Sequence, residues 1–130
     1  MSGESDLDVI LKTMEPVLHN GEYVFCQVPD NYAFNINDVV SVFRESEGTT
    51  IILSRVVADR LRLSYSYISA WITLCVHSSL AAVGLTAAFS KALASAGISC
   101  NVVAAWYHDH IFVDIKDAQK AMHVLSDISK

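Results

Sequence analysis

The amino-acid sequence predicts an α+β fold built from two related halves. Short apolar runs typical of strands alternate along the chain with stretches of helical periodicity. Much the same order of elements occurs twice, in residues 1–66 and in residues 67–130, which indicates an internal duplication. With 130 residues, 52% of them hydrophobic, the chain can bury a core without disulfides.

The N-terminal half begins with a short amphipathic helix. Apolar residues at helical spacing in residues 7–14 predict it, and Pro16 ends it. Residues 22–28 are rich in strand formers and predict the first strand. Residues 39–43 and 49–53 predict two further strands, paired as an antiparallel hairpin across a turn that contains Gly48. Ser54 is then placed to cap a helix over residues 55–61.

The C-terminal half has a clearer pattern. Residues 71–76 predict a buried strand, and either Ser78 or Ser79 can cap the helix that follows. Gly97 stands where a helix commonly ends, and residues 98–106 alternate as on a strand. The buried stripe of that helix comprises Leu85, Ala88, Phe89, Ala92, Leu93 and Ala96.

The chain ends with a turn, a strand and a helix. His108-Asp109-His110 predicts the turn, and residues 111–114 predict a short return strand. Asp117 is placed to cap the final helix. The apolar stripe of this helix comprises Ala118, Ala121, Met122, Leu125 and Ile128.

These elements predict a split, ferredoxin-like sheet. The strands at 71–76 and 98–106 flank one helix, so they should lie parallel with a right-handed crossover. In the N-terminal half the link 29–38 replaces that helix, which makes this half degenerate. Each half also lacks an obvious closing strand. The two halves, packed as one unit, would therefore complete one another's sheet, or a second subunit would do so in a homo-oligomer.

Composition and charge exclude several classes of protein. A net charge of −5 argues against nucleic-acid binding, which requires clustered Lys and Arg. Residues 63–90 carry no charge, but serines, tyrosines and clustered β-branched residues favour a buried strand and helix over a membrane span. The acidic N-terminus does not resemble a secretory signal, so we expect a cytoplasmic protein with three reduced cysteines.

Candidate catalytic and metal sites are few. His108 and His110 lie one residue apart and could share a metal, but no third ligand follows at a suitable spacing. The sequence contains no Gly-x-Ser-x-Gly elbow, no glycine-rich phosphate loop and no local cysteine-protease signature. We therefore predict no catalytic residues, no metal and no cofactor, with a small metal-dependent protein using the two histidines as an alternative.

Residues 71–113 resemble an ACT domain, and the whole chain resembles small tandem-ACT proteins of unassigned function. In that family an apolar strand ends in a loop that opens a helix, and the next strand begins with Gly-Ile-Asn-like residues. Gly97-Ile98-Ser99-Cys100-Asn101 matches the second element. In the first element, Ser78 and Ser79 replace the usual acidic residue and proline, and the glycine arrives late, at Gly84.

The resemblance implies a regulatory module that binds an amino acid at a domain or subunit interface and is not an enzyme. The helix N-terminus after residue 76 would supply unpaired N–H groups for a carboxylate, and Asn101 would supply an amide nearby. Helix capping, packing and surface exposure are the structural alternatives for the same residues, and an oligomerisation scaffold without a ligand is the alternative function. The expected ligand-binding residues are His77, Ser78, Ser79, Val83, Gly84, Leu85, Asn101 and Val102.

Overall fold

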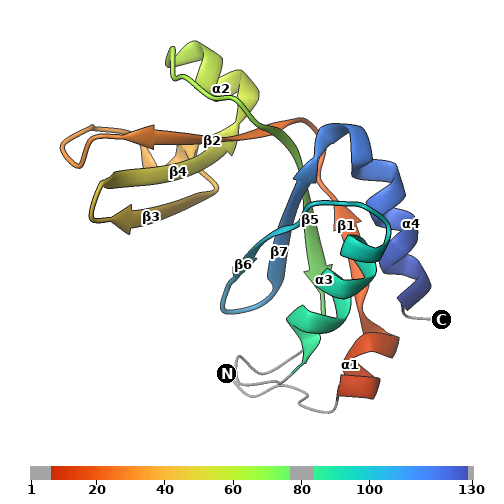
Figure 1. The fold of residues 1–130 in the computed structure, drawn as a ribbon. Coiled ribbons are helices and arrows are strands. Elements are labelled where there is room, and N and C mark those ends of the chain that lie inside the picture. Colours follow the sequence, from red (N-terminus) through yellow and green to blue (C-terminus); the bar gives the residue numbers. More distant parts are fainter. Residues whose placement is uncertain (1–6, 77–83, 129–130) are drawn as a thin grey trace. The chain divides into compact units, whose positions relative to one another are not determined.

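The computed structural model describes residues 7–76 and 84–128, which belong to two compact units (Figure 1). Unit 1 comprises Met1–His19 together with Ala70–Lys130, and unit 2 comprises Asn20–Ser69. In space, the N-terminal segment is therefore grouped with the C-terminal half. The division into residues 1–66 and 67–130 concerns the repeat in the sequence and stays a prediction.

Unit 2 contains an antiparallel sheet and one short helix. Its strands β2 (Tyr23–Val28), β3 (Ser41–Glu45) and β4 (Gly48–Ser54) are arranged in the order β3-β4-β2. The β3 and β4 strands form the predicted hairpin, with Glu45 paired to Gly48. Helix α2 (Arg55–Arg60) begins as predicted, because the Ser54 Oγ accepts a hydrogen bond from the Val57 N–H at 3.2 Å.

The core of unit 2 lies on one face of this sheet. It comprises Val24, Cys26, Val28, Ile51, Leu53 and Ala58, each at most 2% exposed. Between β2 and β3 the chain makes only a single 3-10 turn, η1 (Ile36–Asp38), as expected for the degenerate half. Two side chains of this link, Tyr32 and Phe34, pack against the core.

Unit 1 has the split sheet that the sequence predicts. Its strands β1 (Glu15–Leu18), β5 (Ile68–Cys75), β6 (Asn101–Ala104) and β7 (Asp109–Asp114) follow the order β1-β5-β7-β6. Strand β7 is antiparallel to β6, and Figure 1 shows the arrows of β5 and β7 running in opposite directions. Strands β5 and β6 are therefore parallel, with β7 between them, which confirms the ferredoxin-like arrangement.

Strand β1 closes the sheet of unit 1 and is absent from the predicted elements. It pairs antiparallel with β5, from Glu15 opposite Cys75 to Leu18 opposite Ile72. Pro16 is tolerated there because β1 lies at the edge of the sheet. The first residues of β5 belong to unit 2, where Ser69 pairs with Tyr23 of β2. Each half is thus completed by a strand from outside its own repeat.

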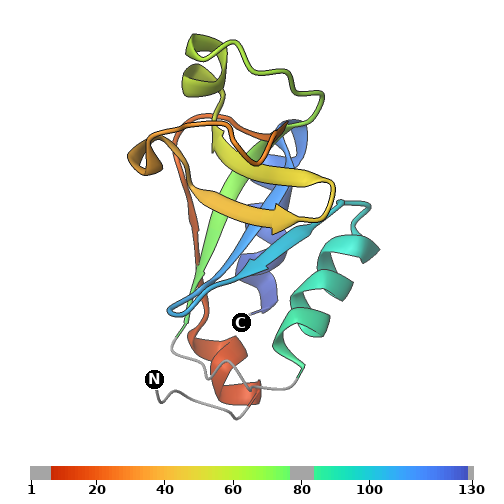
Figure 2. The same cartoon turned by 90° about the vertical axis from the view of Figure 1, so that its left-hand side faces the viewer.

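Three helices, α1 (Leu7–Thr13), α3 (Leu85–Ser95) and α4 (Ala118–Ile128), supply the rest of the unit 1 core (Figures 1 and 2). The α3 and α4 stripes face inward as predicted, and α3 ends at a Gly97 with φ of +77°. The sheet presents Ile72, Leu74, Ile111 and Val113 to this core, while the helices contribute Ile10, Leu85, Phe89, Leu93, Ala121 and Leu125.

Three local predictions need correction. Asp109 and His110 belong to β7, so the turn lies at residues 105–108, where the Ala105 N–H donates to the His108 carbonyl at 3.0 Å. Asp114, not Asp117, is the capping residue: it caps a 3-10 turn, η2 (Ile115–Asp117), that leads into α4. Strand β6 spans four residues instead of nine, because the chain pairs with β7 only from Asn101 onward.

Within the part of the chain that the structure describes, no helix is both long enough and apolar enough to cross a membrane.

Candidate ligand sites

The first candidate is the predicted site at the start of α3. Gly84 precedes this helix and has a left-handed φ of +92°. The helix receives no side-chain hydrogen bond from this capping position. Leu85 is 4% exposed and packs into the core of unit 1. Four predicted residues, His77, Ser78, Ser79 and Val83, lie outside the described residues together with the expected serine cap.

The remaining predicted residues lie at the start of β6. Asn101 is exposed, and its Nδ2 donates to the Phe112 carbonyl at 3.3 Å. Val102 is half-buried and packs against the core, as Leu85 does. Of the predicted residues that the structure describes, Gly84 and Asn101 lie at opposite ends of α3, because Gly84 precedes its first residue and Asn101 opens the strand that follows its last. The 11-residue helix spans about 16 Å, so these two residues do not share one site within a single copy, contrary to the prediction.

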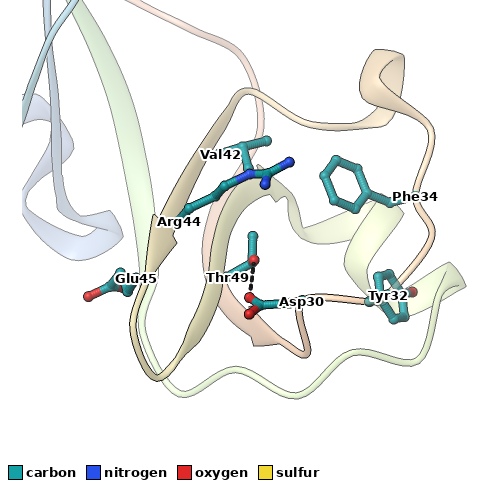
Figure 3. Close-up of a pocket in the computed structure, with 7 residues that line it drawn as sticks. All are labelled: Asp30, Tyr32, Phe34, Val42, Arg44, Glu45 and Thr49. Atoms are coloured by element: carbon teal, nitrogen blue, oxygen red, sulfur yellow. Dashed lines mark hydrogen bonds between the residues drawn. The ribbon is translucent and has the colours of Figure 1, made fainter.

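The second candidate is a pocket in unit 2, beneath the link between β2 and β3 (Figure 3). Its volume is about 260 Å³. Strand register explains part of its lining: Arg44 pairs with Thr49 and Val42 pairs with Ile51, so these side chains share the face that carries the core. The lining residues are Asp30, Tyr32, Phe34, Val42, Arg44, Glu45 and Thr49.

Opposite charges line this pocket without pairing. The Thr49 hydroxyl donates to the Asp30 carboxylate at 3.0 Å and so fixes its position. Figure 3 shows the Arg44 side chain extending toward Phe34, whereas Glu45 points away from the pocket. Among residues 7–76 and 84–128, neither Asp30 nor Arg44 has an ion-pair partner. The pocket thus offers a cation and an anion beside aromatic rings.

A third cluster occupies the face of the unit 1 sheet that carries no helix. The His19 Nε2 lies 2.7 Å from the Thr73 Oγ1, which lies 3.0 Å from the His110 Nδ1. The Trp71 indole N–H donates to the same Nδ1 at 3.1 Å, and the His19 ring stacks on Trp71 at 3.5 Å. An indole N–H can only donate, so the Nδ1 accepts and neutral His110 carries its proton on Nε2.

This cluster predicts a loss of stability at mildly acidic pH. Burial, together with the charges of His108 and His19, lowers the pKa of His110 from its ordinary value of 6.5. The folded state therefore binds this proton more weakly than the unfolded chain does. The contribution of His110 is complete above about pH 6.5 and is lost as pH falls toward the lowered pKa. Urea unfolding at several pH values between 5.5 and 8 measures this slope.

Two variants separate His110 from other titrating groups. In His110→Asn the amide oxygen can still accept from Trp71, and we expect a flatter dependence of unfolding free energy on pH. The matched substitution is His123→Gln, which removes an exposed imidazole from α4 and controls for the loss of one histidine. Asp109 acts in the opposite sense, because burial raises the pKa of its carboxyl above 3.8. An unchanged slope in His110→Asn would contradict the assignment.

Two cysteines and the neighbouring histidines of the described residues bear on nucleophilic and metal chemistry. Burial raises the pKa of the Cys100 thiol to about 11, and it also raises the pKa of Cys26, so both remain protonated near neutral pH. The rings of His108 and His110 lie 6.5 Å apart, and the Nδ1 of His110 is already engaged. In the described ranges, no group of three His, Cys, Asp or Glu side chains could hold a metal.

Sequence reasoning missed the unit 2 pocket and the partners of His110. The predicted hairpin already carried a usable signal, because its register places Arg44 opposite Thr49 on the face shared with Val42. No pattern in the sequence relates Asp30 to Thr49. The contact of His19 with Thr73 depends on β1, which the sequence did not predict.

Known structures resemble this chain over nearly its full length. A Vibrio cholerae protein, described as of unknown function and as a possible transport protein, is 42% identical, with 97% of this chain and 98% of that chain covered and a TM-score of 0.83. The ligand-free regulatory subunit of aspartate kinase from Thermus thermophilus is 8% identical, with 88% and 97% covered and a TM-score of 0.59. An Agrobacterium tumefaciens protein is 18% identical, with 89% of each chain covered and a TM-score of 0.68.

Two family models cover almost the entire sequence. Both describe an ACT domain, one over residues 2–70 and the other over residues 66–127. A search of curated proteins finds no match. Domains of this kind are regulatory, ligand-binding modules rather than catalytic ones. The chain therefore belongs to the ACT-domain family and carries two such domains in tandem.

Proposed function

We propose that this protein is a regulatory module that binds a free amino acid, performs no chemistry, and transmits binding through a domain or subunit interface. The observation that carries the proposal is the match of two ACT domains to the chain. The fold shared with the regulatory subunit of an aspartate kinase agrees with it. Ligand binding would act through different affinities for two states of the module.

The proposed site lies at a subunit interface, between the segment 77–85 of one copy and the start of β6 of another. In the described part of this site, Gly84 provides no side-chain cap for the first N–H groups of the 11-residue helix α3. These N–H groups can therefore donate hydrogen bonds to a bound anion. Asn101 adds an amide that can donate or accept. A ligand carboxylate would lie against the helix of one copy, and Asn101 of the second copy would bind the ligand's polar groups.

Thermal unfolding with each of the twenty amino acids tests the proposal. A ligand at one hundred times its dissociation constant should stabilise the protein by about 2.7 kcal/mol. For the amino acid that binds, Asn101→Ala should reduce this shift. The matched variant Gln119→Ala removes an exposed amide from α4 in the same unit and should leave the shift intact. The proposal fails if none of the twenty stabilises the protein.

The second candidate function is an oligomerisation scaffold without a ligand. Strand β3 lies at the edge of its sheet and exposes the large side chain of Phe43, which is 70% accessible. Such an edge can pair with the same strand of another copy. Sedimentation of the wild type and of Phe43→Lys distinguishes the two functions, since a scaffold would lose its assembly with the charge and respond to no amino acid.

A further inference from the structure

We propose that the unit 2 pocket is a second binding site, separate from the α3 N-terminus, for an α-amino acid with an apolar side chain. It deepens the proposed function and rests on it, because both sites take a free amino acid. The pocket belongs entirely to unit 2 and lies between the β2–β3 link and the β3–β4 hairpin.

The pocket exists because a helix is missing. In unit 1 the 11-residue α3 connects the first two strands of the repeat and buries Leu85, Phe89 and Leu93 against the sheet. In unit 2 the corresponding connection is the link 29–40, whose only helical part is η1. This link covers the sheet with Tyr32 and Phe34 and leaves about 260 Å³ beneath them.

The link is held in place by its own contacts. Asn35 caps η1 by accepting from the Asn37 N–H at 2.9 Å, and Asp38 pairs with Arg60 of α2 at 3.1 Å. At its end, the Val40 N–H donates to the Ile52 carbonyl at 2.6 Å. The pocket is therefore formed before a ligand arrives, which limits the ordering cost of binding.

The lining matches a zwitterion with an apolar side chain. Arg44 has no ion-pair partner among the described residues, and a guanidinium suits a carboxylate. Thr49, 7% exposed, holds the Asp30 carboxylate, which suits an ammonium group. Tyr32 and Phe34, whose rings stack with centroids 6.5 Å apart, and Val42 provide the apolar wall.

The volume sets the size of the ligand. At roughly 30 Å³ per water molecule, the pocket holds about eight or nine waters. It is slightly smaller than the roughly 300–1,000 Å³ of sites for drug-sized molecules. A single free amino acid fits this space, whereas a nucleotide or a peptide exceeds it.

Titration calorimetry of the full chain with L-phenylalanine and L-leucine tests the inference. We expect one equivalent to bind in unit 2, with affinity at least about tenfold weaker in Arg44→Gln and in Asp30→Asn, since each loses a charged contact. Phenethylamine, which lacks the carboxylate, and 3-phenylpropanoate, which lacks the ammonium group, should each bind at least about tenfold more weakly than L-phenylalanine.

Matched variants make each outcome decisive. Glu47→Gln changes an exposed charge of the hairpin turn that does not line the pocket and should keep wild-type affinity, while Asn101→Ala should alter only binding in unit 1. If Asn101→Ala abolishes the binding and Arg44→Gln and Asp30→Asn do not, the inference is overturned while the proposed function stands. If none of the twenty amino acids binds the wild type, both are overturned. Unfolding midpoints near the wild-type value show that the substituted chains remain folded.

Discussion

Replacing Phe89 with alanine is expected to destabilise the protein by about 3–5 kcal/mol. Phe89 lies in the middle of α3, is fully buried, and packs in the core that α3 shares with β5, β7 and α4. Its removal loses the transfer free energy of an aromatic ring and leaves a cavity that the packed neighbours cannot fill. Domains are typically stable by only about 5–15 kcal/mol, so urea unfolding should show a greatly lowered midpoint.

Phe43 provides the matched control, because it is the same residue type with its side chain 70% exposed on β3. Phe43→Ala should change the unfolding free energy by no more than about 0.5 kcal/mol. Equal losses in the two variants would contradict the assignment of the core. A large loss in Phe43→Ala alone would place that side chain in an interface between subunits.

Removing residues 1–19 is expected to unfold unit 1. The shortened chain loses the edge strand β1 and two side chains of the core, Ile10 and Met14, which are 0% and 3% exposed. Truncating one large core side chain already costs about 2–5 kcal/mol, so losing both together with four residues of paired strand should exceed the stability of the unit. Far-ultraviolet circular dichroism follows this through the loss of the helices α3 and α4, which belong to unit 1.

Adding a peptide of residues 7–19 back to the shortened chain should restore the helical signal. Two point variants refine the test on neighbouring positions of α1. Ile10→Ala should cost about 2–5 kcal/mol, whereas Val9→Ala, at a position 42% exposed, should change stability by no more than about 0.5 kcal/mol. A shortened chain with the wild-type unfolding midpoint would show that β1 is dispensable.

The sequence predicts an element well where local chemistry decides its structure. Ser54 caps α2, Gly97 ends α3, and the α3 stripe around Phe89 faces the core, because each depends on neighbours a few residues away. Strand β1 fails this condition. Four residues with a proline among them carry no strand signal, and they are extended because Leu18 and its neighbours pair with a strand more than fifty residues further on.

The candidate sites also divide into features that the local sequence decides and features that distant strand pairing decides. The alternation after Gly97 anticipates the exposure of Asn101, although the strand begins at this residue and not at Ile98. The unit 2 pocket depends on which side chains the irregular link places beneath itself. Asp30 and Thr49 meet because Thr49 opens β4 beside the end of β2, and only the pairing of these strands brings the two residues together.

The pairing of β1 with β5 also has a consequence for synthesis on the ribosome. Leu18 finds its partner, Ile72, only after 54 further residues have been made, which takes roughly 3 to 11 s at about 5–20 residues per second. All three strands of the hairpin-rich unit 2 are complete earlier. During that interval Ile10 and Met14 lack the sheet that later buries them, so these residues are made before unit 2 but are packed after it.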